Sequence, residues 1–230
     1  MSDAREDRYA PARRRMVEQQ IRSRGIELEP VLKAMAEVPR ERFVPRRYRS
    51  QAYEDTALPI GGGQTITQPY LVAWMTVLLR PHPHDRVLEV GTGSGYQAAV
   101  LARLVDEVFT IERVDELAAR ARHTLADLSV DNVAVRSGDG SLGWAGVAPF
   151  DGIIVTAGAL TIPEPLLEQL RVGGRLVMPL GPQSAPQTLV RVTRTSERRY
   201  RREEFGQVRF VPLIGEEGAD EAPSRGDFWF

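Results

Sequence analysis

The middle of the chain alternates between short apolar runs and longer stretches with apolar residues on one face. The apolar runs, such as Gly152-Ile153-Ile154-Val155, are typical of strands buried on both faces of a parallel sheet. They predict strands at residues 86–90, 107–111, 133–137, 152–156 and 175–179. Helices are predicted between them, near residues 97–104, 115–128 and 163–170. Strands that alternate with helices predict a doubly wound, Rossmann-like α/β sheet.

Helices are also predicted before this alternation begins. One covers residues 13–24 and ends at Gly25, a second runs from Pro30 to Pro39, and a third covers residues 69–79. The segment from residue 40 to residue 58 is charged and irregular. We expect it to pack over the sheet with the first two helices, as a cap.

Two strands are predicted after the alternation ends, at residues 188–195 and 207–213. They form an antiparallel hairpin in this interpretation, with an exposed basic connection at residues 198–202. The acidic segment from Gly215 contains proline and glycine and is expected to be disordered. We therefore expect one domain over residues 1–214, with a helical cap (1–60), an α/β core (61–182), C-terminal strands (183–214) and a tail (215–230).

The composition excludes several classes of function. The chain has 230 residues, 42% of them hydrophobic, which fits one α/β domain with appendages. Its net charge of -1 gives no electrostatic reason to expect nucleic acid or an anionic membrane as a partner. There is no cysteine, so disulfides, thiolate chemistry and cysteine metal sites are excluded. His82 and His84 could bind a metal, but no further ligand cluster lies nearby, so none is expected. Because the first residues are charged and no apolar run could span a bilayer, we expect a cytoplasmic protein. No obligate protein partner is inferred from the sequence.

The most informative motif is the loop after the first predicted strand of the sheet. Glu89 precedes it, and glycine then occupies every second position from Gly91 to Gly95. Glycines let the backbone turn tightly and approach a ligand closely. Tyr96 stands where a dinucleotide site of the G-x-G-x-x-G type has its third glycine. A carboxylate beside such a loop suits a ligand with an ammonium and a sulfonium group, such as S-adenosylmethionine, better than a pyrophosphate.

The ends of the following strands carry side chains that suit an adenosine, because ligands bind parallel α/β sheets at this edge. Glu112 is placed to accept hydrogen bonds from both ribose hydroxyls, Asp139 to accept one from the adenine amine, and Gly140 to let the chain close over the ring. The cofactor residues predicted from these motifs are Glu89, Gly91, Thr92, Gly93, Gly95, Glu112, Arg113, Asp139, Gly140 and Thr156. A nicotinamide dinucleotide is the alternative cofactor, and the acidic residue with the G-x-G-x-G spacing favours S-adenosylmethionine.

A second unusual stretch, from Leu58 to Tyr70, precedes the sheet. Three glycines lead into a polar run and then into the helix that starts near Pro69. Thr67 is well placed to cap this helix. The first N–H groups of a helix have no internal partner, so the stretch is predicted to offer a site for an anion such as a carboxylate. A cap without any further role is the alternative for Thr67.

Taken together, these motifs resemble the bacterial type of protein-L-isoaspartate (D-aspartate) O-methyltransferase. The resemblance covers most of residues 13–214, and its family-specific parts are the stretch from Ala57 to Tyr70 and the closing sequence from Val208 to Leu213. It implies a seven-stranded methyltransferase sheet with its last two strands exchanged in order. It also implies transfer of a methyl group from S-adenosylmethionine to the α-carboxylate of L-isoaspartyl residues, which starts repair of damaged proteins through a succinimide. Whether D-aspartyl residues are accepted is left open.

The resemblance also implies roles for single residues. Thr67 stands where the family usually has an active-site serine, so it is the expected catalytic residue, with an added methyl group and a stiffer side chain. The expected substrate-binding residues are Thr65, Ile66, Val211, Pro212 and Leu213. Gly158 replaces the second alanine of the usual Thr-Ala-Ala sequence. A homologue that binds the cofactor and recognises isoaspartyl-type peptides without catalysis is the alternative function.

Overall fold

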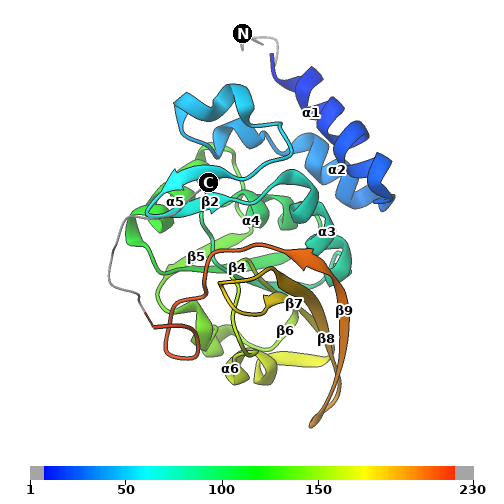
Figure 1. Ribbon diagram of the computed structural model, residues 1–230, viewed down its shortest axis with the longest axis vertical. Helices are drawn as coiled ribbons and strands as arrows, with labels where there is room; N and C mark the ends of the chain where they lie inside the picture. The colour runs from blue at the N-terminus through cyan, green and yellow to red at the C-terminus, as the bar shows by residue number, and fades with distance from the viewer. Residues whose placement is uncertain (1–7, 221–230) are drawn as a thin grey trace.

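A seven-stranded sheet forms the centre of the molecule in this computed structural model, which describes residues 8–220 (Figure 1). Its strands are β3 (Arg86–Val90), β4 (Glu107–Glu112), β5 (Val133–Ser137), β6 (Phe150–Val155), β7 (Leu170–Leu180), β8 (Gln187–Ser196) and β9 (Arg199–Val208). They lie in the order β5-β4-β3-β6-β7-β8-β9, with parallel pairing up to β7 and antiparallel pairing from β7 to β9. The predicted α/β class and the C-terminal antiparallel hairpin are therefore confirmed.

Helices cover both faces of the sheet, which is why its central strands are apolar throughout. Val87 packs in one cluster with residues of α3 (Pro69–Leu79) and α4 (Tyr96–Leu101), while its neighbour Leu88 packs in another with Leu166 of α6 (Glu164–Glu168). Successive strand residues point to opposite faces, so a run buried on both sides loses the alternation of polar and apolar positions. The helix α5 (Asp115–Asp127) lies against β4 and β5.

The cap packs on the helices α3, α4 and α5 and lies over them in Figure 1. Its elements are α1 (Ala10–Met16), the π-helical turn η1 (Val17–Ile21), the 3-10 turn η2 (Arg22–Arg24), α2 (Glu29–Glu37), and the 3-10 turns η3 (Arg40–Arg42) and η4 (Arg46–Gln51). Arg40 is fully buried where cap and core meet. Its Nε donates to the carbonyl of Ala52 at 2.8 Å, and its guanidinium lies 4.8 Å from the ring centroid of Tyr96.

A small hairpin that the sequence pattern did not predict joins the cap to α3. It consists of β1 (Leu58–Gly61) and β2 (Gln64–Ile66), with Gly62 and Gly63 as the turn. Both turn residues have positive φ angles, +60° and +69°, as the common two-residue hairpin turn requires. The strands are too short to show an alternating pattern, so only the glycine pair could have indicated the turn.

The C-terminal segment differs from the expectation in two places. The strand β9 begins at Arg199, so most of the expected basic connection is an edge strand; its exposed arginines discourage pairing with further strands. Residues after β9 make only single bridges, such as that between Gly158 and Pro212. Residues 215–220, for which disorder was expected, form a loop in the structure, in which Ala219 N donates to the carbonyl of Leu213 at 2.8 Å. The terminal Phe228-Trp229-Phe230 sequence lies outside the described residues.

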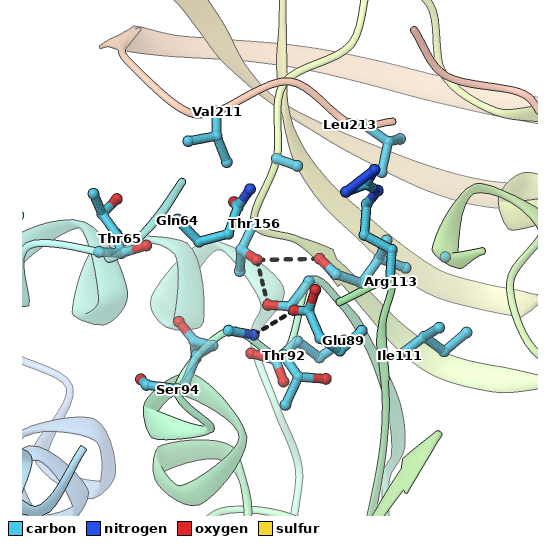
Figure 2. Close-up of a pocket in the computed structure, with 18 of the residues that line it drawn as sticks. Gln64, Thr65, Glu89, Thr92, Ser94, Ile111, Arg113, Thr156, Val211 and Leu213 are labelled. Atoms are coloured by element: carbon cyan, nitrogen blue, oxygen red, sulfur yellow. Dashed lines mark hydrogen bonds between the residues drawn. The ribbon is translucent and has the colours of Figure 1, made fainter. Parts of the chain in front are cut away.

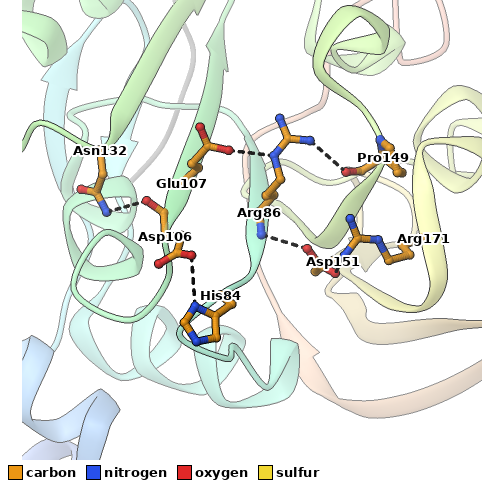
Figure 3. A network of polar contacts seen from close by, with 8 residues as sticks. All are labelled: His84, Arg86, Asp106, Glu107, Asn132, Pro149, Asp151 and Arg171. Atoms are coloured by element: carbon orange, nitrogen blue, oxygen red, sulfur yellow. Dashed lines mark hydrogen bonds and ion pairs between the residues drawn. The ribbon is translucent and has the colours of Figure 1, made fainter.

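Charged side chains connect the amino ends of four strands, at the edge opposite to the glycine loop (Figure 3). Asp151 accepts hydrogen bonds from the backbone N–H of Arg86 at 3.0 Å and from Arg171 at 2.6 Å. Arg86 Nε also donates to Glu107 at 2.7 Å. Exposed ion pairs of this kind stabilise a protein little, about 0–1 kcal/mol each. Among the described residues, no helix combines the length and the apolar character that a membrane span requires.

Candidate active site

An open pocket lies at the carboxyl ends of β3, β4 and β6 (Figure 2). Most of the predicted site residues line it: Thr65, Ile66, Thr67, Glu89, Gly91, Thr92, Gly93, Glu112, Arg113, Gly140, Thr156, Val211, Pro212 and Leu213. Thr65, from β2, and Val211, after β9, line the same pocket as Glu89 and Ile111 at the strand ends (Figure 2). The fold therefore brings together three segments that are far apart in the sequence.

The first glycine of the loop after β3 is required by its neighbour on β6. Gly91 has a φ angle of +97°, and a Cβ atom at this position would lie 2.4 Å from Thr156 Oγ1. The Thr156 hydroxyl donates to the carbonyl of Gly91 at 2.7 Å. The close approach that the sequence suggested thus involves a protein side chain, which ties the glycine loop to the end of β6.

The last glycine of the loop, Gly95, does not line the pocket. It has a φ angle of +89° as the N-cap of α4, and a Cβ atom there would lie 3.3 Å from the Cβ of Ala121 on α5. Its predicted role in binding the cofactor would therefore be through the turn that it allows. Tyr96, which follows it, is buried against Phe43 of the cap with 5.5 Å between ring centroids. The cap thus accommodates a large side chain where a dinucleotide site has a glycine.

Glu112 is held by the backbone of two loops. Its carboxylate accepts hydrogen bonds from Gly93 N at 2.7 Å and from Val114 N at 2.9 Å. A carboxylate offers about four acceptor positions, so further donors can be accommodated. Because Glu112 lines the pocket, these remaining positions fit a pair of ribose hydroxyls.

Asp139 is not among the residues that line the pocket. Its carboxylate accepts hydrogen bonds from Ser141 N at 2.8 Å, from Ser141 Oγ at 2.7 Å and from Glu216 N at 2.7 Å. Burial opposes the charge, but these hydrogen bonds outweigh it and hold the pKa of Asp139 below its ordinary value. Contact between Asp139 and an adenine amine stays a prediction, while Gly140, the first residue of the 3-10 turn η5 (Gly140–Leu142), does line the pocket.

Glu89 is the most unusual polar residue of the site. It is completely buried, and its Oε1 atom has no hydrogen-bond partner among the described residues. Burial raises its pKa to about 8, the charge of Glu112 adds to the rise, and a hydrogen bond from Thr110 opposes it. A buried acceptor without a partner is costly, which suits a ligand that brings a positively charged donor.

The sequence suggested Thr67 as the N-cap of α3, and the structure shows that this prediction is wrong. The N-cap is Gln68, without a side-chain hydrogen bond, and Pro69 is the first helical residue. The backbone N–H of Tyr70 donates to Asp55 Oδ1 at 3.2 Å, so a carboxylate from the cap already occupies part of the expected anion site. The Thr67 hydroxyl has no hydrogen-bond partner within residues 8–220 and lines the pocket, which leaves it available to a ligand.

Residues 211–213, which we call the strap, are fixed to the end of β6. Gly158 N donates to the carbonyl of Val211, and Leu213 N donates to the carbonyl of Gly158, both at 2.8 Å. Pro212 is the bridge partner of Gly158, so in this parallel pairing its own carbonyl points to the other side. The Gln187 side chain occupies the space beside Gly158: a Cβ atom at Gly158 would lie 2.9 Å from Gln187 Nε2. This close contact explains the glycine at residue 158.

Several residues that line the pocket were not predicted from the sequence: Gln64, Val72, Val90, Ser94, Tyr96, Gln97, Ile111 and Ile214. Gln64 and Ser94 lie within the two unusual loops, so their position next to predicted site residues was an available signal. The apolar residues at the strand ends, such as Val90 and Ile111, could not be distinguished from ordinary core residues in the sequence.

The sheet order and the strand-end pocket define a nucleoside-cofactor methyltransferase of the seven-stranded class. Residues 12–218 match the family described as protein-L-isoaspartate(D-aspartate) O-methyltransferase. A protein-L-isoaspartate O-methyltransferase 2 of Pelobacter propionicus is 57% identical over 203 residues, covering 88% of this chain and 90% of that protein. One of Methanoregula boonei is 57% identical over 206 residues, covering 90% and 94%. The chain therefore belongs to the protein-L-isoaspartate (D-aspartate) O-methyltransferase family.

Solved structures agree with this fold. A protein-L-isoaspartate O-methyltransferase gives a TM-score of 0.79 at 28% identity, covering 89% of this chain and 66% of that longer chain. A putative protein-L-isoaspartate O-methyltransferase of Plasmodium falciparum, solved in complex with S-adenosyl-L-homocysteine, gives a TM-score of 0.76 at 24% identity, covering 88% and 98%. The second likeness supports the fold alone.

Proposed function

We propose that the chain transfers a methyl group from S-adenosylmethionine to the α-carboxylate of L-isoaspartyl residues in damaged proteins and peptides. Membership of the family makes it an S-adenosylmethionine-dependent protein carboxyl methyltransferase. The observation that supports the assignment of the site is the single pocket in which Glu89 and Glu112 meet Thr67 and the strap.

The strand ends have the chemistry that this cofactor needs. We assign the ribose hydroxyls to the remaining acceptor positions of Glu112 and the ammonium group to Glu89 Oε1, which has no partner among the described residues. When bound, S-adenosylmethionine supplies an electrophilic methyl group on a sulfonium. Gly91, Thr92 and Gly93 line the pocket beside these carboxylates and would contact the cofactor through their backbone.

The reaction needs no general base from this chain. An α-carboxyl group has an ordinary pKa of about 3.5, so the substrate is already an anion at neutral pH. The work left to the protein is to hold one carboxylate oxygen in line with the methyl group and to exclude water. Thr67 has a free hydroxyl in the pocket, and we assign it this orienting role together with the neighbouring Thr65 and Ile66.

The strap suits the backbone of the substrate. The carbonyl of Val211 and the N–H of Leu213 are hydrogen-bonded to Gly158. The opposite side of the strap therefore presents the carbonyl of Pro212, and proline has no N–H to present there. An extended peptide that places an N–H opposite this carbonyl would be held beside the pocket. Because all peptide carboxylates carry a similar charge, selection of isoaspartate must come from the distance between this carbonyl and Thr67. An isoaspartyl residue adds one methylene to the main chain and shortens the branch that carries the carboxylate.

Transfer of a radiolabelled methyl group to an isoaspartyl peptide tests the proposal, with the aspartyl peptide of the same sequence as the control. We expect label in the isoaspartyl peptide only, as an ester that is lost in mild base. A protein that binds S-adenosylhomocysteine but labels neither peptide would refute the assigned activity. Equal labelling of both peptides would refute the assigned selectivity.

The domain organisation and the compartment also belong to this proposal. We infer that residues 1–214 act as one unit, since β8 and β9 continue the central sheet and the cap shares a cluster of buried residues with α3, α4 and α5. We place the reaction in the cytoplasm, where ageing proteins would provide isoaspartyl substrates.

A further inference from the structure

A buried carboxylate and two buried hydroxyls form a chain of hydrogen bonds at the base of the pocket. Thr92 Oγ1 lies 2.6 Å from Thr110 Oγ1, and Thr110 Oγ1 donates to Glu89 Oε2 at 2.5 Å. All three residues are at most 3% exposed. A threonine hydroxyl has one proton to donate. When Glu89 is ionised it can only accept, so Thr110 donates to the carboxylate, Thr92 donates to Thr110, and both hydroxyls are oriented toward Glu89.

Strand pairing fixes this arrangement. Glu89 on β3 and Thr110 on β4 are register partners, so their side chains lie side by side on one face of the sheet. Thr92 is anchored through its own N–H, which donates to the carbonyl of Ile111 at 3.2 Å. The hydroxyls therefore hold Oε2, and Oε1 is the oxygen left for the pocket.

The surroundings favour a neutral Glu89 before a ligand binds. Its pKa is raised to about 8, chiefly by burial. The other titratable side chains that line the pocket are Tyr96 of α4 and Glu112 and Arg113 at the end of β4; β6 contributes none. Of these, Glu112 disfavours the charged form of Glu89. The Thr110 hydrogen bond favours the charged form, so Thr110 makes ionisation easier when a cation arrives.

We propose that Thr92 and Thr110 are positioning residues that aim Glu89 Oε1 at the ammonium group of the methyl donor, and that binding of this group releases one proton from Glu89 to the solvent. The inference rests on the proposed function, because it assumes that S-adenosylmethionine and its product occupy this pocket. The balance is simple: the neutral carboxylic acid loses its proton, and the carboxylate forms an ion pair with an ammonium group that is already charged.

Calorimetry with S-adenosylhomocysteine at pH 7, in buffers of different ionisation enthalpy, measures the protons released. We expect nearly one proton per site at pH 7, falling toward zero above pH 9. The control ligand is 5′-methylthioadenosine, which keeps the adenosine and the sulfur but lacks the ammonium group, and we expect it to release none. Glu89→Gln should abolish the release with little change in side-chain volume.

Two matched variants test the threonine chain. Thr110→Val keeps the shape and removes the hydroxyl. We expect S-adenosylhomocysteine to bind about tenfold more weakly at pH 7 and the release to persist to higher pH, because a hydrogen bond that favours the charged form of Glu89 is lost. Thr110→Ser keeps the hydroxyl and should resemble the parent. Equal affinities and pH profiles for the valine and serine variants would refute the positioning role.

The outcomes separate this inference from the proposed function. Three results would overturn the inference: no proton release by the parent protein, the same release by Glu89→Gln, or the same release with 5′-methylthioadenosine. In each of these cases, methylation of isoaspartyl peptides would still support the proposed function. Failure to bind S-adenosylhomocysteine at all would overturn both. Release that follows Glu89, the ammonium group and the Thr110 hydroxyl would establish the inference.

Discussion

Gly140 allows a critical contact between the loop after β5 and the strand β3. A Cβ atom at Gly140 would lie 2.6 Å from Val90 Cγ1, and Val90 is only 1% exposed. The φ angle of Gly140 is not positive, so Gly140→Ala causes no backbone strain, and its effect is steric. Overpacking of this kind costs about 1–3 kcal/mol, offset by about 0.4–1 kcal/mol from the stiffer unfolded chain. We expect a net loss of about 1–2 kcal/mol.

The steric explanation predicts rescue by a second substitution. Val90→Ala alone removes two buried methyl groups, which costs about 1.5–2.5 kcal/mol. In the double variant the new methyl group at residue 140 enters the vacated space, so the double variant should be about 1–2 kcal/mol more stable than the sum of the single effects predicts. Urea unfolding of the parent, the two single variants and the double variant measures this coupling. The affinity for S-adenosylhomocysteine should also fall in Gly140→Ala, because Val90 and Gly140 both line the pocket.

Gly146 provides the control, since a Cβ atom there would meet nothing within 4 Å. Gly146→Ala should leave stability unchanged or raise it slightly. Additive effects of Gly140→Ala and Val90→Ala, within about 0.5 kcal/mol, would refute the steric reasoning.

Three further predictions concern single residues of the pocket. Thr67→Val should lower kcat for an isoaspartyl peptide about tenfold or more, because a hydrogen bond to a charged group is lost, while Thr67→Ser should keep the activity. An unchanged affinity for S-adenosylhomocysteine in both variants would exclude a folding defect. Glu112→Gln should weaken S-adenosylhomocysteine binding about ten- to a hundredfold in calorimetry, since charged acceptors are lost for both ribose and loop. Glu89 has a folded-state pKa near 8, above its unfolded value, so its contribution to stability is lost as pH rises from about 4.5 to 8. Glu89→Gln should remove this slope and, without ligand, be several kcal/mol more stable than the parent at pH 9; identical pH profiles of unfolding would contradict it.

Local pattern was enough for the elements whose apolar residues repeat regularly. The predicted bounds of α3 and β3 agree with the structure, because a buried helix bounded by prolines and a doubly buried strand each carry their own signal. The β1–β2 hairpin and the start of β9 were missed for opposite reasons. The first is too short to show a period, and the second presents charged residues on a sheet edge, where pairing with β8 outweighs their polarity.

The sequence by itself determined the class of sheet, the glycine loop and the acidic residues at the strand ends, since these depend on residue types at fixed spacing along one segment. Only the tertiary structure decided what each residue contacts. It placed Asp55 at the start of α3, Thr156 against Gly91 and Glu216 over Asp139. Contacts between residues this far apart depend on how helices and strands pack in three dimensions, and a spacing along the chain does not encode that packing.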